Sequence, residues 1–328
     1  MKCLYCGKTL ADDSSEVEFR TGWHKGCVKK FFGVSELPYV DLSEERLRQL
    51  ADESISRGFT VPGVQKKLSL HLSNEDKPRL TLVNYPTGYI LKPQTEEYPA
   101  LPEAEHLVMH MAKATGIKTV PFGLIRIGDE NTQLVYITKR IDRVTKKNKL
   151  QKLAMEDFCQ LEERLTKDKY KGSYERCAKV VEQYSTRAKL DLAEIYLRIL
   201  FSYVIGNSDM HLKNFSLIET KEGNGEYVLS EAYDMLPVNV IIPEDTEELA
   251  LTLKGKKRKF KREEFVSFGE GIGLAEKVCE NMIRKIISLE PKYNVLIDES
   301  YLPENMKENL CQLIRQRVAV LNQLSSTN

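Results

Sequence analysis

The chain has 328 residues, of which 41% are hydrophobic and 30% charged, and this composition excludes a disordered or fibrous protein. Lysine plus arginine (49) nearly balances aspartate plus glutamate (48), so no net field draws the molecule to nucleic acid or to an anionic membrane, and any polyanion site must be local. No run approaches about eighteen apolar residues, and the start MKCLYCGKTL lacks the apolar core of a secretory signal, so we expect a cytoplasmic protein.

Residues 1–35 carry two pairs of side chains of the kind that hold zinc. Two residues separate Cys3 from Cys6, two separate His24 from Cys27, and seventeen lie between the pairs. Four such donors close a tetrahedral site, so we expect a zinc knuckle or ribbon with a structural Zn²⁺, because so short a segment without a core needs the metal to fold. The alternative is a set of reduced cysteines in a small core around Trp23. The module could contact nucleic acid, a partner protein or the rest of the chain.

Residues 36–143 alternate short strand-like runs with helical patterns. Leucines and an isoleucine recur at near-helical spacing after Asp41, which predicts a helix there. Short runs rich in β-branched and aromatic residues follow, interrupted by an apolar-periodic segment over 102–115 that ends at Gly116, and this order predicts an antiparallel sheet with one helix. The run LVYITKRIDR, 134–143, begins as a buried strand and becomes charged, as a connector would. The strand-like runs are LSLHL, LTLVNY, GYILK and FGLIRI.

Residues 144–328 are mainly helical in pattern, which makes the expected fold class α+β with a sheet-containing lobe over 36–143 and a helical lobe over 144–328. The basic run 256–264 could contact phosphate or form a solvated helix start. Single cysteines in amphipathic patterns are expected to be buried one by one rather than joined in disulfides: Cys159, Cys177, Cys279 and Cys311. Helices are expected over 156–164, 174–185, 189–206, 263–270, 274–288 and 303–324.

The segment IGNSDMHLKNFSL, 205–217, places Asp209 five residues before Asn214, after an apolar helix and before a strand. An aspartate in a loop can accept a hydroxyl proton, and an asparagine five residues on can give its amide oxygen to Mg²⁺. A second strand, reached through a turn near Gly223, would bring Asp234 at its end to the same ion. The alternative is that these residues only cap a helix, shape a turn and stop a strand; their order and spacing favour a kinase.

This segment resembles the HipA family of serine/threonine kinases, whose catalytic loop reads Asp-x-His-x-Lys-Asn-Phe-Ser. The resemblance covers about residues 57–325 and implies a two-lobed protein-kinase-like fold. It implies that Asp209 is the base and that Asn214 and Asp234 hold Mg²⁺. It also implies that His211 and Tyr233 line the nucleotide site.

The run TVPGVQKKLSL, 60–70, is similar to the family's phosphate-covering loop, with its Gly-x-Gln-x-Lys core. Only one glycine is present, which is a weak signal without the family context. Family members carry a serine before this core whose autophosphorylation ejects the loop, and here Thr60 is the candidate for that modification, while the adjacent proline departs from the usual small residue. The resemblance implies nucleotide contacts from Pro62, Gly63, Val64, Gln65, Lys66 and Lys67.

The run GYILKPQ, 88–94, resembles the family's ATP-binding strand, which makes Lys92 the candidate for the α- and β-phosphates. Glu105 then falls where a helix carboxylate could pair with this lysine, and Glu103 is the rival partner. The connector residues Lys139, Arg140 and Ile141 match the family's adenine-contacting segment, although two of the three differ from its Glu-Arg-Phe.

The resemblance implies a serine/threonine protein kinase that uses ATP and Mg²⁺. Family targets include aminoacyl-tRNA synthetases, and the kinase is restrained as a toxin by a helix-turn-helix antitoxin that binds DNA. The chain resembles short members, in which an amino-terminal subdomain may exist as a separate small protein. Two other functions remain open: a small-molecule or lipid kinase of the same fold, and an inactive module that tethers an antitoxin to operator DNA.

Overall fold

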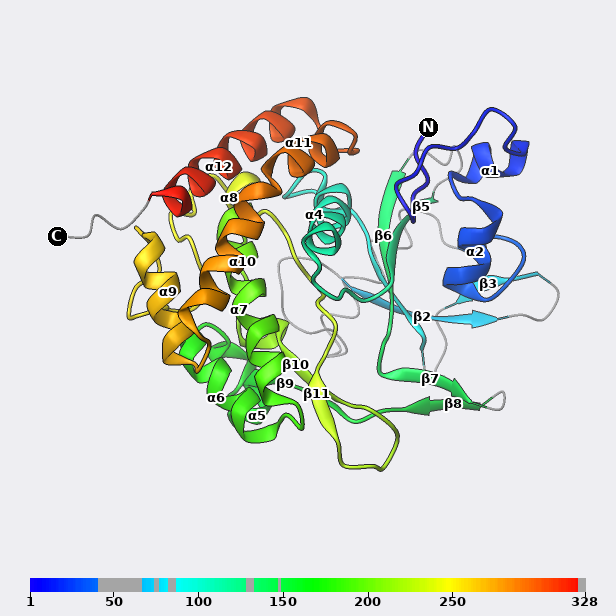
Figure 1. Ribbon diagram of the computed structural model, residues 1–328. Coiled ribbons are helices and arrows are strands. Elements are labelled where there is room, and N and C mark those ends of the chain that lie inside the picture. The colour runs from blue at the N-terminus through cyan, green and yellow to red at the C-terminus, as the bar shows by residue number, and fades with distance from the viewer. Residues whose placement is uncertain (41–66, 74–76, 82–86, 128–132, 147–148, 324–328) are drawn as a thin grey trace. The chain divides into compact units, whose positions relative to one another are not determined.

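The computed structural model describes residues 1–40, 67–73, 77–81, 87–127, 133–146 and 149–323 (Figure 1). The helix expected after Asp41 and residues 60–66 of the expected phosphate-covering loop lie outside these ranges. The chain forms two compact units: the sheet unit, 1–106 with 120–150, and the helical unit, 107–119 with 151–328. No helix in the described ranges is both long enough and apolar enough to cross a membrane.

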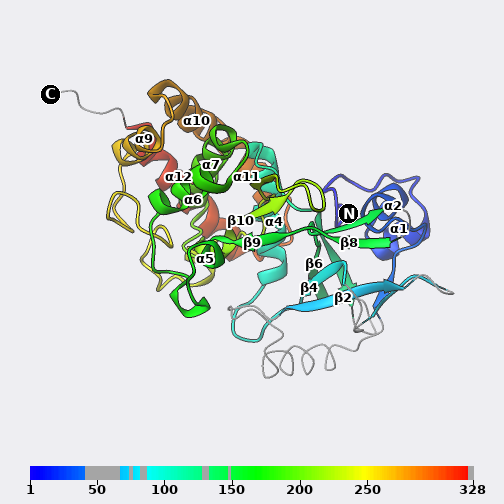
Figure 2. The same ribbon diagram turned by 90° about the horizontal axis from the view of Figure 1, so that it is seen from below.

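Within the described part of the sheet unit, six strands form one sheet in the order β1-β3-β2-β4-β6-β5. The pairings are antiparallel as expected, except that β1 runs parallel to β3. The central strands β4 and β6, visible beside β2 in Figure 2, carry apolar side chains that form the core of the sheet. The strands are β1 (Tyr39–Val40), β2 (Leu68–Ser73), β3 (Arg79–Thr81), β4 (Tyr89–Lys92), β5 (Phe122–Ile127) and β6 (Gln133–Lys139).

Helix α4 (Leu101–Thr115) is the helix expected between the strands, and it continues from the sheet unit into the helical unit. The amide of Leu101 donates to Oε1 of Gln94 at 3.1 Å, so a side chain that follows β4 caps the helix start. The helix ends before Gly116, whose φ of 92° is a left-handed conformation that suits glycine.

The amino-terminal segment contains α1 (Glu16–Thr21) and α2 (Lys25–Phe32). A capping box between Ser15 and Glu18 starts α1. We expected this segment to lack a core, and that expectation is wrong. Trp23, Phe31 and Phe32 are almost fully buried, and the rings of Phe31 and Phe32 pack on Tyr89 of β4, so the segment shares the core of the sheet unit.

The helical unit is built around α7 (Ala188–Ile205), which is buried along most of its length, and α7 contacts α6, α10 and α12 (Figure 1). Strands β9 (Met155–Asp157), β10 (Ser216–Glu219) and β11 (Tyr227–Leu229) form a small antiparallel sheet. The other helices are α5 (Phe158–Leu161), α6 (Tyr174–Tyr184), α8 (Val238–Ile241), α9 (Arg262–Gly271), α10 (Glu276–Ser288), α11 (Glu290–Asp298) and α12 (Glu304–Asn322).

The structure differs from the predicted elements at several places. The helix expected over 156–164 is a strand, β9, followed by the single turn α5, because β9 pairs with β10. Strands β7 (Arg143–Lys146) and β8 (Lys149–Lys152) and helix α11 were not predicted. The polar sequence of β7 and β8 has no apolar alternation that would indicate a pair of strands.

Candidate functional site

The loop that carries Asp209 is held at both ends. Helix α7 ends at Gly206, where φ is 72° and an added Cβ would lie 2.5 Å from the side chain of Leu313, so this position requires glycine. Beyond it, the amide of Asp209 donates to Oδ1 of Asn207 at 3.2 Å, and the hydroxyl of Tyr174 donates to the carbonyl of Met210 at 3.0 Å. These contacts position the loop backbone independently of any ligand.

The carboxylate of Asp209 accepts a hydrogen bond from the hydroxyl of Tyr170. The Tyr170 ring lies edge-on to His211 with centroids 5.0 Å apart, and Nε2 of His211 is 3.9 Å from Oδ1 of Asp209. Tyr170 is 41% exposed, and the partial burial of its ring and hydroxyl raises its pKa, which the carboxylates of Asp209, Asp245 and Asp234 raise further. Three carboxylates therefore favour the protonated form of one hydroxyl. Tyr170 was not among the predicted residues.

Asn214 lies in a buried 3-10 turn, Leu212–Asn214, directly before β10. Its Oδ1 accepts the amide of His211 at 3.1 Å, which fixes the side-chain rotamer. An amide oxygen has two lone pairs, so one hydrogen bond leaves capacity for a cation. Oxygen donors of this kind suit Mg²⁺.

Asp234 has a φ of 59°, a left-handed conformation that is uncommon outside glycine and is often found at functional positions. We expected it at the end of the second strand, but β11 ends at Leu229, and a short bridge of Ala232 to Thr119 precedes the aspartate instead. The hydroxyl of Tyr233 is hydrogen bonded to Ser216 at 2.6 Å and donates to the carbonyl of Lys213 at 3.0 Å. Tyr233 thus ties the segment before Asp234 to the loop that carries Asn214.

Lys213 pairs with Asp157 at 2.5 Å, and both side chains are largely buried. Asp157 is also the N-cap of α5, where its Oδ1 accepts the amide of Gln160. Residues 156–160 therefore anchor the loop of Asp209 and Asn214 through an ion pair and through the β9–β10 pairing.

In the sheet unit, Nζ of Lys92 lies 2.6 and 2.7 Å from the two carboxylate oxygens of Glu105, and both side chains are buried. The ammonium also lies 5.3 Å from the centroid of the Tyr136 ring. The rival Glu103 has a carboxyl oxygen without a hydrogen bond, and burial raises its pKa. The geometry is that of a preformed lysine–carboxylate pair between a strand and a helix.

The other expected nucleotide-binding residues are placed only in part. Pro62, Gly63, Val64, Gln65 and Lys66, together with Thr60, lie outside the described ranges, and Lys67 directly precedes β2. The amide of Lys139 donates to the carbonyl of Pro121 and that of Arg140 to the carbonyl of Gly88, both at 2.9 Å. The Arg140 guanidinium donates two hydrogen bonds to the carboxylate of Asp142. Ile141 lies in the turn between these two residues.

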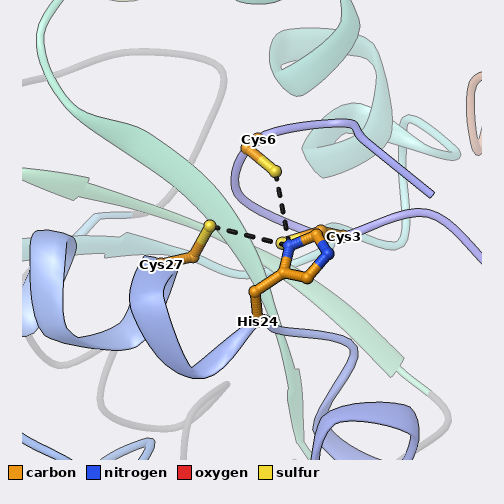
Figure 3. A group of neighbouring side chains, drawn as sticks. All are labelled: Cys3, Cys6, His24 and Cys27. Atoms are coloured by element: carbon orange, nitrogen blue, oxygen red, sulfur yellow. Dashed lines mark hydrogen bonds between the residues drawn. The ribbon is translucent and has the colours of Figure 1, made fainter. Parts of the chain in front are cut away.

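The side chains of Cys3, Cys6, His24 and Cys27 converge, as Figure 3 shows, and their ligand atoms all lie within 4.8 Å of one another. Nδ1 of His24 is 3.5 Å from Sγ of Cys6 and 3.7 Å from Sγ of Cys27. Burial and then the neighbouring thiols of Cys3 and Cys6 raise the pKa of Cys27, so a cation is the natural means of holding thiolates here. The donor set fits Zn²⁺.

Comparison with known proteins relates the chain to a group of kinases. The model of the family described as the HipA-like C-terminal domain matches residues 59–292. A candidate kinase of Haemophilus influenzae is 29% identical over 292 residues, which are 82% of this chain and 83% of that protein. The candidate kinase Y4dM of Sinorhizobium fredii is 30% identical over 243 residues, 70% of this chain but 57% of that longer protein.

Two solved structures share the fold. A chain in the Shewanella oneidensis MR-1 toxin–antitoxin complex of HipA, HipB and operator DNA matches with a TM-score of 0.65 and 19% identity, covering 83% of this chain and 70% of that one. The Helicobacter pylori proinflammatory kinase CtkA matches with a TM-score of 0.51 and 16% identity, covering 76% of this chain and 90% of that one. At these identities the likeness concerns the fold alone.

Proposed function

The chain belongs to the family described as the HipA-like C-terminal domain, and from this membership we propose that it is an ATP- and Mg²⁺-dependent kinase of protein serine or threonine hydroxyls. The observation that carries the proposal is the arrangement around Tyr170. Its hydroxyl donates to Asp209, and the carboxylate of Asp234 contributes to its raised pKa. Tyr233 also ties the segment before Asp234 to the carbonyl of Lys213. These contacts support a site in the helical unit that the proposed base and the proposed metal ligands share.

In the proposed reaction, Asp209 orients the substrate hydroxyl and accepts its proton as the oxygen attacks the γ-phosphorus of ATP. The bond from that phosphorus to the β–γ bridging oxygen breaks, and ADP leaves with the electron pair. Asn214 and Asp234 would hold Mg²⁺, which when bound neutralises charge on the phosphates.

Further residues have supporting roles in this proposal. Lys92, held by Glu105, would contact the α- and β-phosphates as a point charge. His211 and Tyr233, together with residues 139–141 and 62–67, would contact the nucleotide. The cluster of Cys3, Cys6, His24 and Cys27 would bind a structural Zn²⁺.

We also propose that the protein is the toxin of a toxin–antitoxin pair. The support is the likeness to the Shewanella chain, which was solved with an antitoxin and operator DNA. A helix-turn-helix antitoxin would then be the partner that binds DNA, and a component of translation, such as an aminoacyl-tRNA synthetase, would be the substrate. A separate small protein could supply the amino-terminal subdomain, and Thr60 could be autophosphorylated.

A labelling experiment tests the kinase. The protein is incubated with γ-labelled ATP and Mg²⁺, alone and with a bacterial lysate, and the labelled products are identified by mass spectrometry. We expect label on serine or threonine of proteins, and a loss of at least about 10³-fold in Asp209→Asn and Asp234→Asn, because these variants remove the base and a metal ligand. Asp298→Asn is the matched control, since Asp298 is exposed at the end of α11.

Three outcomes would count against the proposal. Label that appears only on a small molecule would identify a small-molecule or lipid kinase. Full labelling by Asp209→Asn would exclude Asp209 as the base. A biological effect that persists in both inactive variants would favour a binding module.

A further inference from the structure

The amino-terminal metal cluster lies at a junction between the edge of the sheet and helix α4. We propose that Cys3, Cys6, His24 and Cys27 bind one Zn²⁺ whose role is to brace α4 and so keep Glu105 on Lys92. The metal-binding part stands by itself, and the effect on nucleotide binding rests on the proposed kinase function.

The four residues of the cluster lie on two short turns, as the ligands of a tetrahedral zinc site do. Cys3 and Cys6 flank a tight turn in which the amide of Gly7, with a φ of 71°, donates to the carbonyl of Cys3 at 2.9 Å. His24 is the N-cap of α2, and Cys27 lies in its first turn. Zinc bonds of about 2.0 to 2.3 Å at tetrahedral angles place donor atoms roughly 3.5 to 3.8 Å apart. The distances of 3.5 and 3.7 Å from His24 to the two thiols agree with this.

Leu4 lies between the two cysteines of the turn, and its peptide connects three parts of the sheet unit. Its amide donates to the carbonyl of Gly22 at 2.8 Å. Its carbonyl accepts the amide of Leu124 in β5 at 2.9 Å and Nε2 of His106 in α4 at 3.0 Å. Because a carbonyl only accepts, His106 carries its proton on Nε2. An ion bound by Cys3 and Cys6 would therefore fix the position of the Leu4 carbonyl, which accepts hydrogen bonds from the sheet edge and from the helix.

His106 transmits this restraint to the lysine pair. It directly follows Glu105 in α4, and consecutive helical side chains point about 100° apart, so one turn of helix faces both the metal turn and Lys92. Glu105, His106 and Lys92 are all buried, so a shift of this turn cannot be absorbed by solvent-exposed side chains. Movement of Leu4 should therefore move the carboxylate that holds the ammonium of Lys92.

The first measurement is metal content. Purified wild-type protein should contain one zinc per chain by elemental analysis, and Co²⁺ exchanged into the site should show the absorption of a tetrahedral thiolate complex. Cys6→Ser should lose both signals, and Cys311→Ser, which changes a half-buried cysteine on α12, should keep them. Wild-type protein without zinc or a cobalt spectrum would overturn the site.

The second measurement is the coupling to α4. Chelation of zinc from wild-type protein should weaken MgATP binding about tenfold and speed amide exchange in the first turns of α4, and both effects should reverse when Zn²⁺ is restored. His106→Leu should reproduce the weaker binding with its zinc retained, while His106→Gln, which keeps a donor, should restore part of it.

The outcomes separate the two proposals. If zinc-loaded wild-type protein does not bind MgATP, the kinase proposal fails. Amide exchange in α4, measured with and without zinc, still tests whether the metal braces the helix. If MgATP binds equally well with and without zinc and α4 exchange is unchanged, the brace is wrong although the metal site stands. Because zinc is removed from the wild-type chain, the result does not depend on a cysteine variant that could fail to fold.

Discussion

Tyr170 shows how a residue distant in sequence can contact a candidate catalytic residue. It lies 39 residues before Asp209, and its hydroxyl donates to the aspartate carboxylate while its ring packs edge-on against His211. Partial burial, followed by the three neighbouring carboxylates, raises its pKa, so the hydroxyl keeps its proton and remains a donor across the pH range of ordinary assays. The aspartate is thus held in one rotamer before any substrate arrives.

Removal of this donor should slow catalysis. Tyr170→Phe keeps the ring but deletes the hydrogen bond to a charged acceptor, and we expect kcat to fall about tenfold with little change in KM for ATP, which corresponds to roughly 1.4 kcal/mol. The measurement is steady-state kinetics at several pH values. An unchanged or increased kcat would show that Tyr170 competes with the substrate hydroxyl instead of positioning the base.

At this scale the sequence indicates candidate polar residues but not all of their partners. Asp209, Asn214 and Asp234 could be chosen because their chemistry and spacing lie within one stretch of chain. The sequence leaves the choice between Glu103 and Glu105 open. Residues two positions apart on a helix point roughly 200° apart, and only the packed helix shows which of them faces Lys92. Tyr170 carried no local signal, because its contact depends on how its loop folds back.

Strand β9 lies where the sequence pattern predicts a helix. Residues 156–164 have a helix-like apolar pattern, yet Asp157 pairs across the small sheet with Ser216, and tertiary pairing overrides the local preference. The pairing places the Asp157 carboxylate against Lys213, one residue before the proposed metal ligand Asn214. An ion pair and a strand together therefore hold the loop of Asp209 and Asn214 against the rest of the unit.

Loss of this ion pair should destabilise the helical unit. Lys213→Met keeps the length of the side chain but leaves a largely buried carboxylate without its cation, and we expect the free energy of unfolding to fall by about 2 kcal/mol. Lys171→Met is the matched control, because Lys171 is 74% exposed in its pair with Asp168 and should change stability by less than about 0.5 kcal/mol. Urea unfolding followed by circular dichroism measures both, and equal effects would contradict the anchoring role.

For the molecule as a whole, the predicted mixed fold of HipA type is confirmed by the family match and by the solved structures. Strands and long helices were largely predictable, because their apolar periodicity reports burial directly. The shared core of the amino-terminal segment was not, because Trp23 and Phe31 are buried by contacts with distant strands. The family match also does not extend to residues 1–58, where the cluster of Cys3, Cys6, His24 and Cys27 lies.

The overall charge makes a prediction about DNA. With 49 basic and 48 acidic side chains, the chain alone should bind duplex DNA only non-specifically, with a Kd of about 10⁻⁴ to 10⁻⁶ M at physiological salt. Addition of the proposed antitoxin should supply the tight binding. Fluorescence anisotropy over a salt series measures this, and nanomolar binding by the chain alone would place a DNA site on this protein.

The contact of Leu4 with Leu124 also has a consequence for how the protein behaves in solution. Among the strands that the structure describes, β5 is the last of its sheet, and the first residues of the chain shield its outer side. A polypeptide beginning at residue 36 would expose that border together with the surface of Gly123 on which Trp23 rests. Exposed borders of this kind recruit strands from other copies, so such a fragment should self-associate more readily than the full chain.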